Sequence, residues 1–180
     1  MTTSPNLGIQ TGDRLVLRGP RMDFVLRTVP TRHGGSIQRE VVIHPGAVII
    51  LPVLADGRLV FIRNHRHTIS AELLELPAGT LEPAEDPALC AARELTEETG
   101  YTADRLEPLG WFYTSPGILT EKMYAFLATD LQTGPQNLED NEEIRVEILT
   151  MDEAEGLIAK NQLVDAKSLA TLLRYKMRRG

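Results

Sequence analysis

The chain has 180 residues, of which 42% are hydrophobic and 24% are charged, as in an ordinary folded protein. Its formal net charge of −6 argues against a general binder of nucleic acids or membrane surfaces, because both are polyanionic. The single cysteine, Cys90, excludes an internal disulfide and fits a reducing compartment. The first residues show no signal-peptide pattern, and the longest apolar run, 47–55, is too short to span a bilayer. We therefore expect a cytoplasmic protein.

The N-terminal quarter of the chain predicts a small β-region. Short alternating or β-branched stretches predict strands over residues 14–16, 22–29 and 37–43, and Gly/Pro breaks separate them. Because this pattern precedes a longer one, we divide the chain into an N-terminal region, 1–45, and a main domain, 46–180.

The main domain predicts strands interrupted by helices. Ala55-Asp56-Gly57, between two apolar stretches, predicts a hairpin turn. The predicted strands cover 48–54, 58–62, 73–76, 106–113, 122–129 and 144–150, a polar loop covers 130–141, and two late helices cover 152–160 and 166–177. In the last helix, Leu169, Leu172 and Leu173 should face inward. This order predicts an α/β (α+β) fold in which a mixed β-sheet lies between helices.

The stretch from Gly79 to Tyr101 predicts the central helix. Asp86 can cap its first turn, Pro87 suits a position that needs no amide proton, and Gly100 suits the left-handed residue that ends a helix. The residues expected to form the inward stripe are Leu89, Ala92, Leu95 and Thr99.

Acidic residues gather on one side of this helix. Glu94 and Glu98 are four residues apart, so their carboxylates should lie one turn above each other, and Glu97 borders the same face. Arg93 is four residues from Glu97 and could hold that carboxylate while its neighbours stay free. A solvated acidic surface would explain the spacing alone. Clustered carboxylates also suit a hard cation such as Mg2+, which takes oxygen ligands and bridges to phosphates.

The fixed offsets within this stretch carry more information than the charges. A glycine (Gly79), a glutamate (Glu85), Arg-Glu (93–94), a hydrophobe (95), Glu-Glu (97–98), a glycine (100) and a final hydrophobe (101) at these offsets should co-occur by chance in about one in ten million chains of this length. These residues resemble the Nudix box. The resemblance implies a mixed sheet between helices and hydrolysis of a nucleoside diphosphate linked to another moiety, with Mg2+, or Mn2+ as an alternative, as cofactor. Tyr101 departs from the pattern, since the family more often has an aliphatic residue there.

The resemblance also implies roles for individual residues. Glu94, Glu97 and Glu98 would hold the metal together with the backbone carbonyl of Ala78, and Glu97 and Glu98 would count among the catalytic residues. The structural positions of the box would be Gly79, Glu85, Arg93 and Gly100.

A second resemblance narrows the substrate. Pro116 stands fifteen residues beyond Tyr101, and the segment around it resembles the ADP-ribose pyrophosphatase branch, although Ser-Pro-Gly is also common turn chemistry. The substrate-binding residues implied are Arg39, Arg66, Ser115, Pro116, Gly117 and Glu121. An arginine fork suits phosphate oxygens, and the alternative for each arginine is an ordinary surface position. His65 stands where many relatives have an aromatic residue. Because no third ligand lies nearby in sequence, His65 and His67 are weak candidates for zinc.

An acidic cluster before the strand at 144–150 supplies a candidate for activating water. In this branch a glutamate of a mobile loop helps to deprotonate water; Glu142 aligns best, with Glu139 and Glu143 as alternatives. The resemblance therefore predicts that the protein is a Mg2+-dependent enzyme that cleaves ADP-ribose to AMP and ribose 5-phosphate. The alternatives are a pyrophosphatase for GDP-mannose or a UDP-sugar, or a non-catalytic nucleotide sensor. The resemblance further implies a homodimer in which N-terminal strands complete the partner's site.

Overall fold

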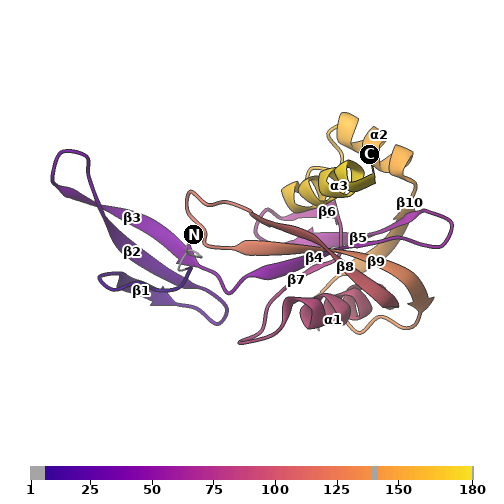
Figure 1. Ribbon diagram of the computed structural model, residues 1–180, viewed down its shortest axis with the longest axis horizontal. Helices are drawn as coiled ribbons and strands as arrows, with labels where there is room; N and C mark the ends of the chain where they lie inside the picture. The colour runs from indigo at the N-terminus through magenta and orange to yellow at the C-terminus, as the bar shows by residue number, and fades with distance from the viewer. Residues whose placement is uncertain (1–6, 139–141, 180) are drawn as a thin grey trace. The chain divides into compact units, whose positions relative to one another are not determined.

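The computed structural model describes residues 7–138 and 142–179 (Figure 1), and these form two compact units. The first unit comprises the described residues up to Gly46 together with Phe112–Met123. The second comprises Ala47–Trp111 and the described residues from Tyr124 onward. The division of the chain into 1–45 and 46–180 stays a prediction.

The first unit contains the three strands expected near the N-terminus. β1 (Arg14–Arg18), β2 (Asp23–Pro30) and β3 (Ser36–Ile43) form an antiparallel sheet in the order β1-β2-β3. Every residue of β1 is exposed, including Leu17 at 64%, and Val25 of β2 is fully buried. The sheet thus leaves apolar side chains uncovered within its own unit.

Residues after Ser115 also belong to this unit, because they pair with the end of β3. Val42 donates its backbone N–H to Ile118 at 2.8 Å and accepts one from Thr120 at 3.0 Å. Residues more than seventy positions apart therefore form one local structure, which the sequence pattern did not predict.

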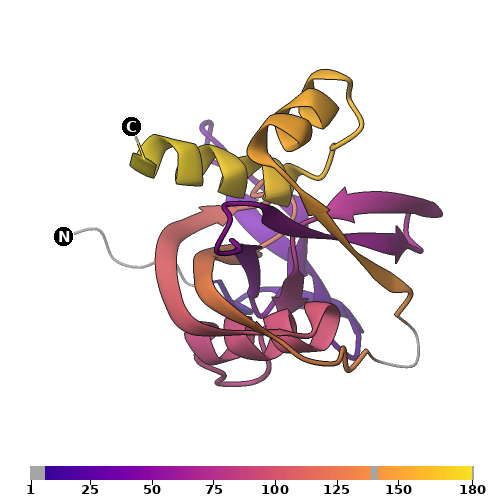
Figure 2. The same cartoon turned by 90° about the vertical axis from the view of Figure 1, so that its right-hand side faces the viewer.

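The second unit contains two sheets that lie between helices. One sheet has the order β7-β4-β9-β8 and the other has the order β10-β5-β6. The strands are β4 (Ala47–Pro52), β5 (Leu59–Arg66), β6 (Ala71–Glu75), β7 (Ala78–Thr80), β8 (Tyr101–Tyr113), β9 (Lys122–Thr133) and β10 (Ile144–Leu149), and the helices are α1 (Pro87–Thr99), α2 (Met151–Ala159) and α3 (Ala166–Arg179). Figures 1 and 2 show α1 on one side of these sheets and α2 and α3 on the other, so the predicted fold class is confirmed.

The predicted hairpin around Gly57 is only half right. The tight turn forms, with Gly57 at φ 87° and Leu54 N donating to Arg58 O at 2.8 Å. Beyond a single bridge between Val53 and Leu59, however, the two strands enter different sheets. The strand after the turn pairs instead with β6 and β10, because its buried run from Leu59 to Ile62 needs cover on both faces.

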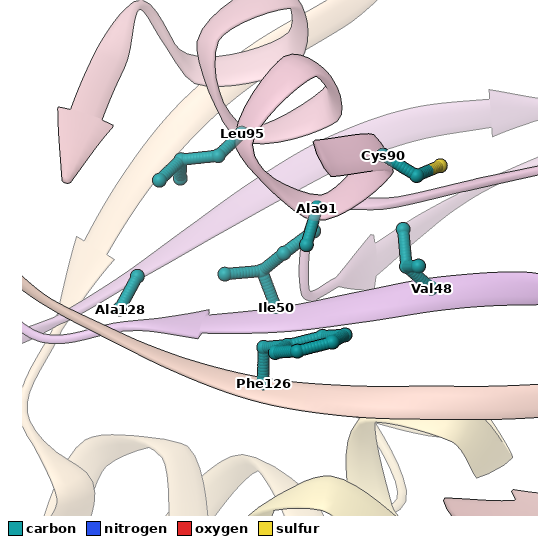
Figure 3. Close-up of a cluster of buried hydrophobic side chains, with 7 residues drawn as sticks. All are labelled: Val48, Ile50, Cys90, Ala91, Leu95, Phe126 and Ala128. Carbon is teal, nitrogen blue, oxygen red and sulfur yellow. The ribbon is translucent and has the colours of Figure 1, made fainter. Parts of the chain in front are cut away.

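The core between α1 and the first sheet differs in detail from the expected stripe. Figure 3 shows Val48 and Ile50 of β4 and Phe126 and Ala128 of β9 packed against Cys90, Ala91 and Leu95 of α1. Leu89 is 69% exposed and Ala92 is also exposed, so two of the four predicted inward residues are wrong. Five consecutive non-polar residues, 88–92, leave the buried face of the helix undecided, and packing on β4 selects it.

Two smaller predictions also need correction. Leu172 is buried in α3, but Leu173 is 60% exposed, and Tyr175 takes the inward position instead. β9 continues to Thr133, so the loop predicted to begin at residue 130 begins later. No helix in the described part of the chain is long and apolar enough to cross a membrane.

Candidate active site

Local sequence fixes both ends of α1, the helix that carries the acidic residues. Asp86 accepts hydrogen bonds from Ala88 N at 2.8 Å and Leu89 N at 3.4 Å, and Pro87 occupies the first turn. Gly100 ends the helix at φ 74° and donates to Thr96 O. A Cβ on Gly100 would also lie 2.4 Å from Gly134 O. Glycine is therefore required there both by backbone conformation and by space.

Gly79 lies directly against the carboxylate of Glu94. A Cβ on Gly79 would lie 1.8 Å from Glu94 Cδ and 1.9 Å from Oε1. Only glycine lets β7 approach the helix so closely. The side chain of Glu94 is 13% exposed, and this burial raises the pKa of its carboxyl, an effect that Arg93 opposes.

Glu98 is the buried acid of the cluster, with 3% of its surface exposed. Its Oε2 accepts a hydrogen bond from the backbone N–H of Ala78 at 2.8 Å. Burial raises the pKa of Glu98 well above its ordinary value, and the charges of Glu94 and Glu142 raise it further. Glu98 thus faces the core side of the helix, and not an outer acidic face.

Arg93 holds three carboxylates. Its Nη1 donates to Glu94 Oε1 and Glu97 Oε2, each at 2.8 Å, and its Nε and Nη2 donate to Glu85 at 3.1 and 3.2 Å. The hydrogen bonds from Arg93 lower the pKa of Glu85 to about 2. The expectation that Arg93 would hold Glu97 alone is therefore wrong, because the guanidinium fork reaches Glu94 as well.

The structure brings Glu142 toward this cluster. Its charge raises the pKa of both Glu94 and Glu98, which places the three carboxyl groups within electrostatic reach of one another. Glu142 is half-buried, whereas Glu143 is exposed. Glu139, the other alternative, lies outside the described residues.

Arg66, at the end of β5, is the basic group that acts on Glu98. Its charge lowers the pKa of Glu98, in opposition to the effect of burial. Its guanidinium is paired with Glu75, a fully buried residue that sequence reasoning did not single out. A signal was present, because Glu75 interrupts the apolar run Leu73-Leu74-Glu75-Leu76.

The remaining predicted substrate residues belong to the first unit. Arg39 is exposed on β3, opposite Arg27, and Ser115, Pro116 and Gly117 form an exposed turn in which Ser115 O accepts from Leu119 N at 2.8 Å. Glu121 lies 3.4 Å from His44 Nε2 and accepts a hydrogen bond from the Thr114 hydroxyl. Burial lowers the pKa of His44, and the nearby charge of Glu121 opposes that change.

The donor atoms of the acidic cluster fit a hard divalent cation. Glu94 and Glu98 bring like charges together, and the Glu94 carboxylate fills the space beside Gly79 in β7. Among the described residues, no three His, Cys, Asp or Glu side chains already form a group that could hold a metal. Arg93 occupies oxygens of Glu94 and Glu97 that a cation would use.

The two histidines considered for zinc and the single cysteine have structural explanations. The His65 and His67 rings contact each other edge to face with centroids 4.9 Å apart. Cys90 is fully buried beneath α1, and burial raises the pKa of its thiol, so it lacks the reactive thiolate that a nucleophile needs.

Comparison with known proteins agrees with the geometry of α1. The family model described as NUDIX domain matches residues 43–172. A protein named ADP-ribose pyrophosphatase from Bacillus subtilis (strain 168) is 37% identical over 155 residues, which cover 85% of this chain and 84% of that protein. A GDP-mannose pyrophosphatase from Yersinia pestis (strain Pestoides F) is 34% identical over 157 residues, or 81% of this chain and 78% of that protein.

A solved structure supports the fold. The chain described as "Crystal structure of ADP compounds hydrolase" superimposes with a TM-score of 0.81 at 22% sequence identity, covering 93% of this chain and 91% of that chain.

Proposed function

The chain belongs to the Nudix family, and from this premise we propose that it hydrolyses the diphosphate bond of ADP-ribose to give AMP and ribose 5-phosphate, with Mg2+ as cofactor and Mn2+ as an alternative. The observation that carries the proposal is the arrangement of the box residues. Buried Glu98 accepts from Ala78 N, and Glu94 fills the space beside Gly79. The name of the Bacillus subtilis relative supports ADP-ribose as the substrate.

The metal would be held by Glu94, Glu97 and Glu98 together with the backbone carbonyl of Ala78. When bound, a divalent cation supplies neutralisation of the diphosphate charge and a lower pKa for a water molecule. Carboxylates whose pKa is raised by mutual repulsion and burial regain a stable charged form beside a cation, which is why this cluster suits that role.

The protein's own groups would perform three further tasks. Glu142 would accept a proton from the attacking water, because it lies within electrostatic reach of Glu94 and Glu98. Arg66 and Arg39 would donate hydrogen bonds to diphosphate oxygens. The turn at Ser115, Pro116 and Gly117, with Glu121, would contact the rest of the substrate.

A second candidate substrate is GDP-mannose, because the 34% identical Yersinia pestis relative carries that name and matches a similar share of the chain. His65 bears on this choice, since it replaces the aromatic residue expected beside the base. The catalytic machinery would be the same for both substrates, so only the base and sugar contacts would differ. A UDP-sugar or a purely nucleotide-sensing role stays as an alternative without a specific supporting contact.

We also propose that the active form is a homodimer. The first unit supports this proposal, because all five residues of β1 are exposed and Leu17 is 64% exposed. Apolar strand residues of this kind are normally covered by another surface. Light scattering that gives the mass of one chain would contradict the dimer. A cytoplasmic location stays a prediction.

The test is product analysis of the purified protein with Mg2+ and a panel of nucleotide sugars, beside Glu98→Gln. AMP from ADP-ribose, lowered at least about 100-fold in the variant, is the expected result. Glu155→Gln, which alters an exposed pair with Lys176, serves as the control and should retain activity. Cleavage of GDP-mannose alone would change the substrate, and binding without any cleavage would contradict the enzymatic function.

A further inference from the structure

A fully buried carboxylate lies directly behind Arg66. Glu75, the last residue of β6, has no exposed surface, and its two oxygens accept hydrogen bonds from Nε and Nη2 of Arg66 at 2.7 and 2.5 Å. A buried carboxylate is costly unless it is paired and hydrogen-bonded. The bidentate contact meets that need, and it also restricts the guanidinium to one plane.

The first turn of α3 adds a second cation to this carboxylate. Lys167 Nζ lies 3.3 Å from Glu75 Oε2 and 2.5 Å from Asp165 Oδ1. Ser168 Oγ donates to Asp165 Oδ2 at 2.7 Å and accepts from Leu76 N at 2.8 Å, which ties α3 to the residue after Glu75. Two cations and two carboxylates therefore form a charge-balanced cluster that joins α3 to the ends of β5 and β6.

Arg66 uses only one edge of its guanidinium in this cluster. Nε and Nη2 bind Glu75, whereas Nη1 forms no hydrogen bond with any residue in the described part of the chain. The side chain is 38% exposed. Glu98 lies near enough for its charge to act on Arg66, so the cation stands at the border of the acidic cluster.

We propose that Glu75, held in turn by Lys167, is a positioning residue that presents the open edge of Arg66 to the diphosphate of the substrate. The inference rests on the proposed function, because it requires an anionic substrate beside Glu94 and Glu98. Its physical basis is geometric. A lone arginine has many rotamers, and a bidentate partner selects the one in which the remaining donors face outward.

Glu75→Gln tests the proposal, because it keeps the size of the side chain and removes its charge. Glu147→Gln is the matched control. Glu147 makes the same kind of bidentate contact, at 2.6 and 3.2 Å, with Arg63 on the same strand. Residues 63 and 66 point to opposite faces of β5, so the control removes a bidentate ion pair away from Arg66, although Glu147 is 31% exposed where Glu75 is fully buried.

The measurements are the Kd for ADP-ribose in EDTA, where no turnover occurs, and kcat and KM with Mg2+. Glu75→Gln should weaken binding and raise KM about tenfold, with kcat changed less than about threefold, and Glu147→Gln should match the parent. The double variant with Arg66→Lys should lose no more affinity than the larger single loss, because both changes break one contact. A purely structural role would lower thermal stability without separating KM from kcat.

Parental affinity in a folded Glu75→Gln protein, or additive losses in the double variant, would overturn the proposal. If Glu75→Gln does not fold, Lys167→Met tests the proposal instead. This variant removes the contact between Lys167 and Glu75 but leaves the contact between Glu75 and Arg66 in place, so ADP-ribose should bind about threefold more weakly. Parental affinity in Lys167→Met would then overturn it. A parent protein that neither binds nor cleaves any nucleotide sugar would instead show that the proposed function has failed.

Discussion

The carboxylate of Glu94 occupies the space that a side chain at position 79 would need, with only 1.8 Å between its Cδ and a Cβ on Gly79. Non-bonded carbon atoms normally stand about 3.5–4.0 Å apart. β7 can thus lie this close to α1 only because Gly79 carries a hydrogen atom where every other residue carries a Cβ. Any larger residue would displace either the strand or the carboxylate.

Gly79→Ala should therefore lower kcat/KM at least about 100-fold, because a displacement of about 1 Å in a site can have that effect. Activity as a function of Mg2+ concentration measures it, and the half-saturating concentration should rise. Gly156→Ala is the control: its Cβ would meet nothing within 4 Å. That change should leave activity intact and stabilise α2 by about 0.5–1 kcal/mol. Parental kcat/KM in Gly79→Ala would contradict the role of the contact.

Glu142→Gln should lower kcat about 100-fold or more, because general-base catalysis typically contributes about 10²–10⁴-fold. The charge of Glu142 raises the pKa of Glu94 and Glu98, whereas the neighbouring Glu143 is exposed to solvent. Glu143→Gln should therefore retain kcat within about threefold. Steady-state kinetics at saturating Mg2+ compare the two. A large loss in Glu143→Gln with little loss in Glu142→Gln would reverse the assignment.

Glu85 should stabilise the fold in a pH-dependent way. Arg93 lowers the pKa of Glu85 from 4.5 to about 2. Because the folded-state pKa lies below the unfolded one, the stabilisation is present above pH 4.5 and is lost as the pH falls toward 2. Glu85→Gln should lower the free energy of unfolding by about 1–3 kcal/mol at pH 7. Urea denaturation at pH 7 and pH 3 should show a smaller difference from the parent at pH 3, and an equal difference would refute the pairing.

Cys90 should not react with thiol reagents in the native protein. It is fully buried against β4 and β9, and burial raises the pKa of its thiol. Iodoacetamide at pH 8 should modify it only after urea is added, and mass spectrometry detects the adduct. Cys90→Ala should retain activity and lose about 1 kcal/mol of stability through the cavity that it leaves. Rapid native labelling would mean that α1 opens far more readily than its packing indicates.

The elements around the acidic helix were predictable because their signals are local. Asp86, Pro87 and Gly100 act on neighbouring backbone groups, and the structure places α1 at Pro87–Thr99 as those signals indicated. The buried face of α1 was not predictable in the same way. Leu89 and Cys90 are adjacent and both apolar, and only contact with Val48 and Ile50 decides that Cys90 points inward.

The turn at Gly57 shows the same division at the level of strands. Its sequence predicts a reversal of the chain, and the reversal forms. Which strands then pair depends on segments far away in the sequence, since β5 lies between β6 and β10. Local turn chemistry therefore determined the reversal, and long-range pairing determined the sheets.

In the candidate site, the sequence by itself determined the family, the helix and the spacing of Glu94, Glu97 and Glu98, because all of these depend on offsets of a few residues. Only the tertiary structure decided that Glu98 is buried, that the charge of Glu142 reaches it, and that Glu75 and Lys167 stand behind Arg66. Residues 75 and 167 are joined across ninety-two positions. Such contacts follow from how sheets and helices pack together, and no periodicity within one segment encodes them.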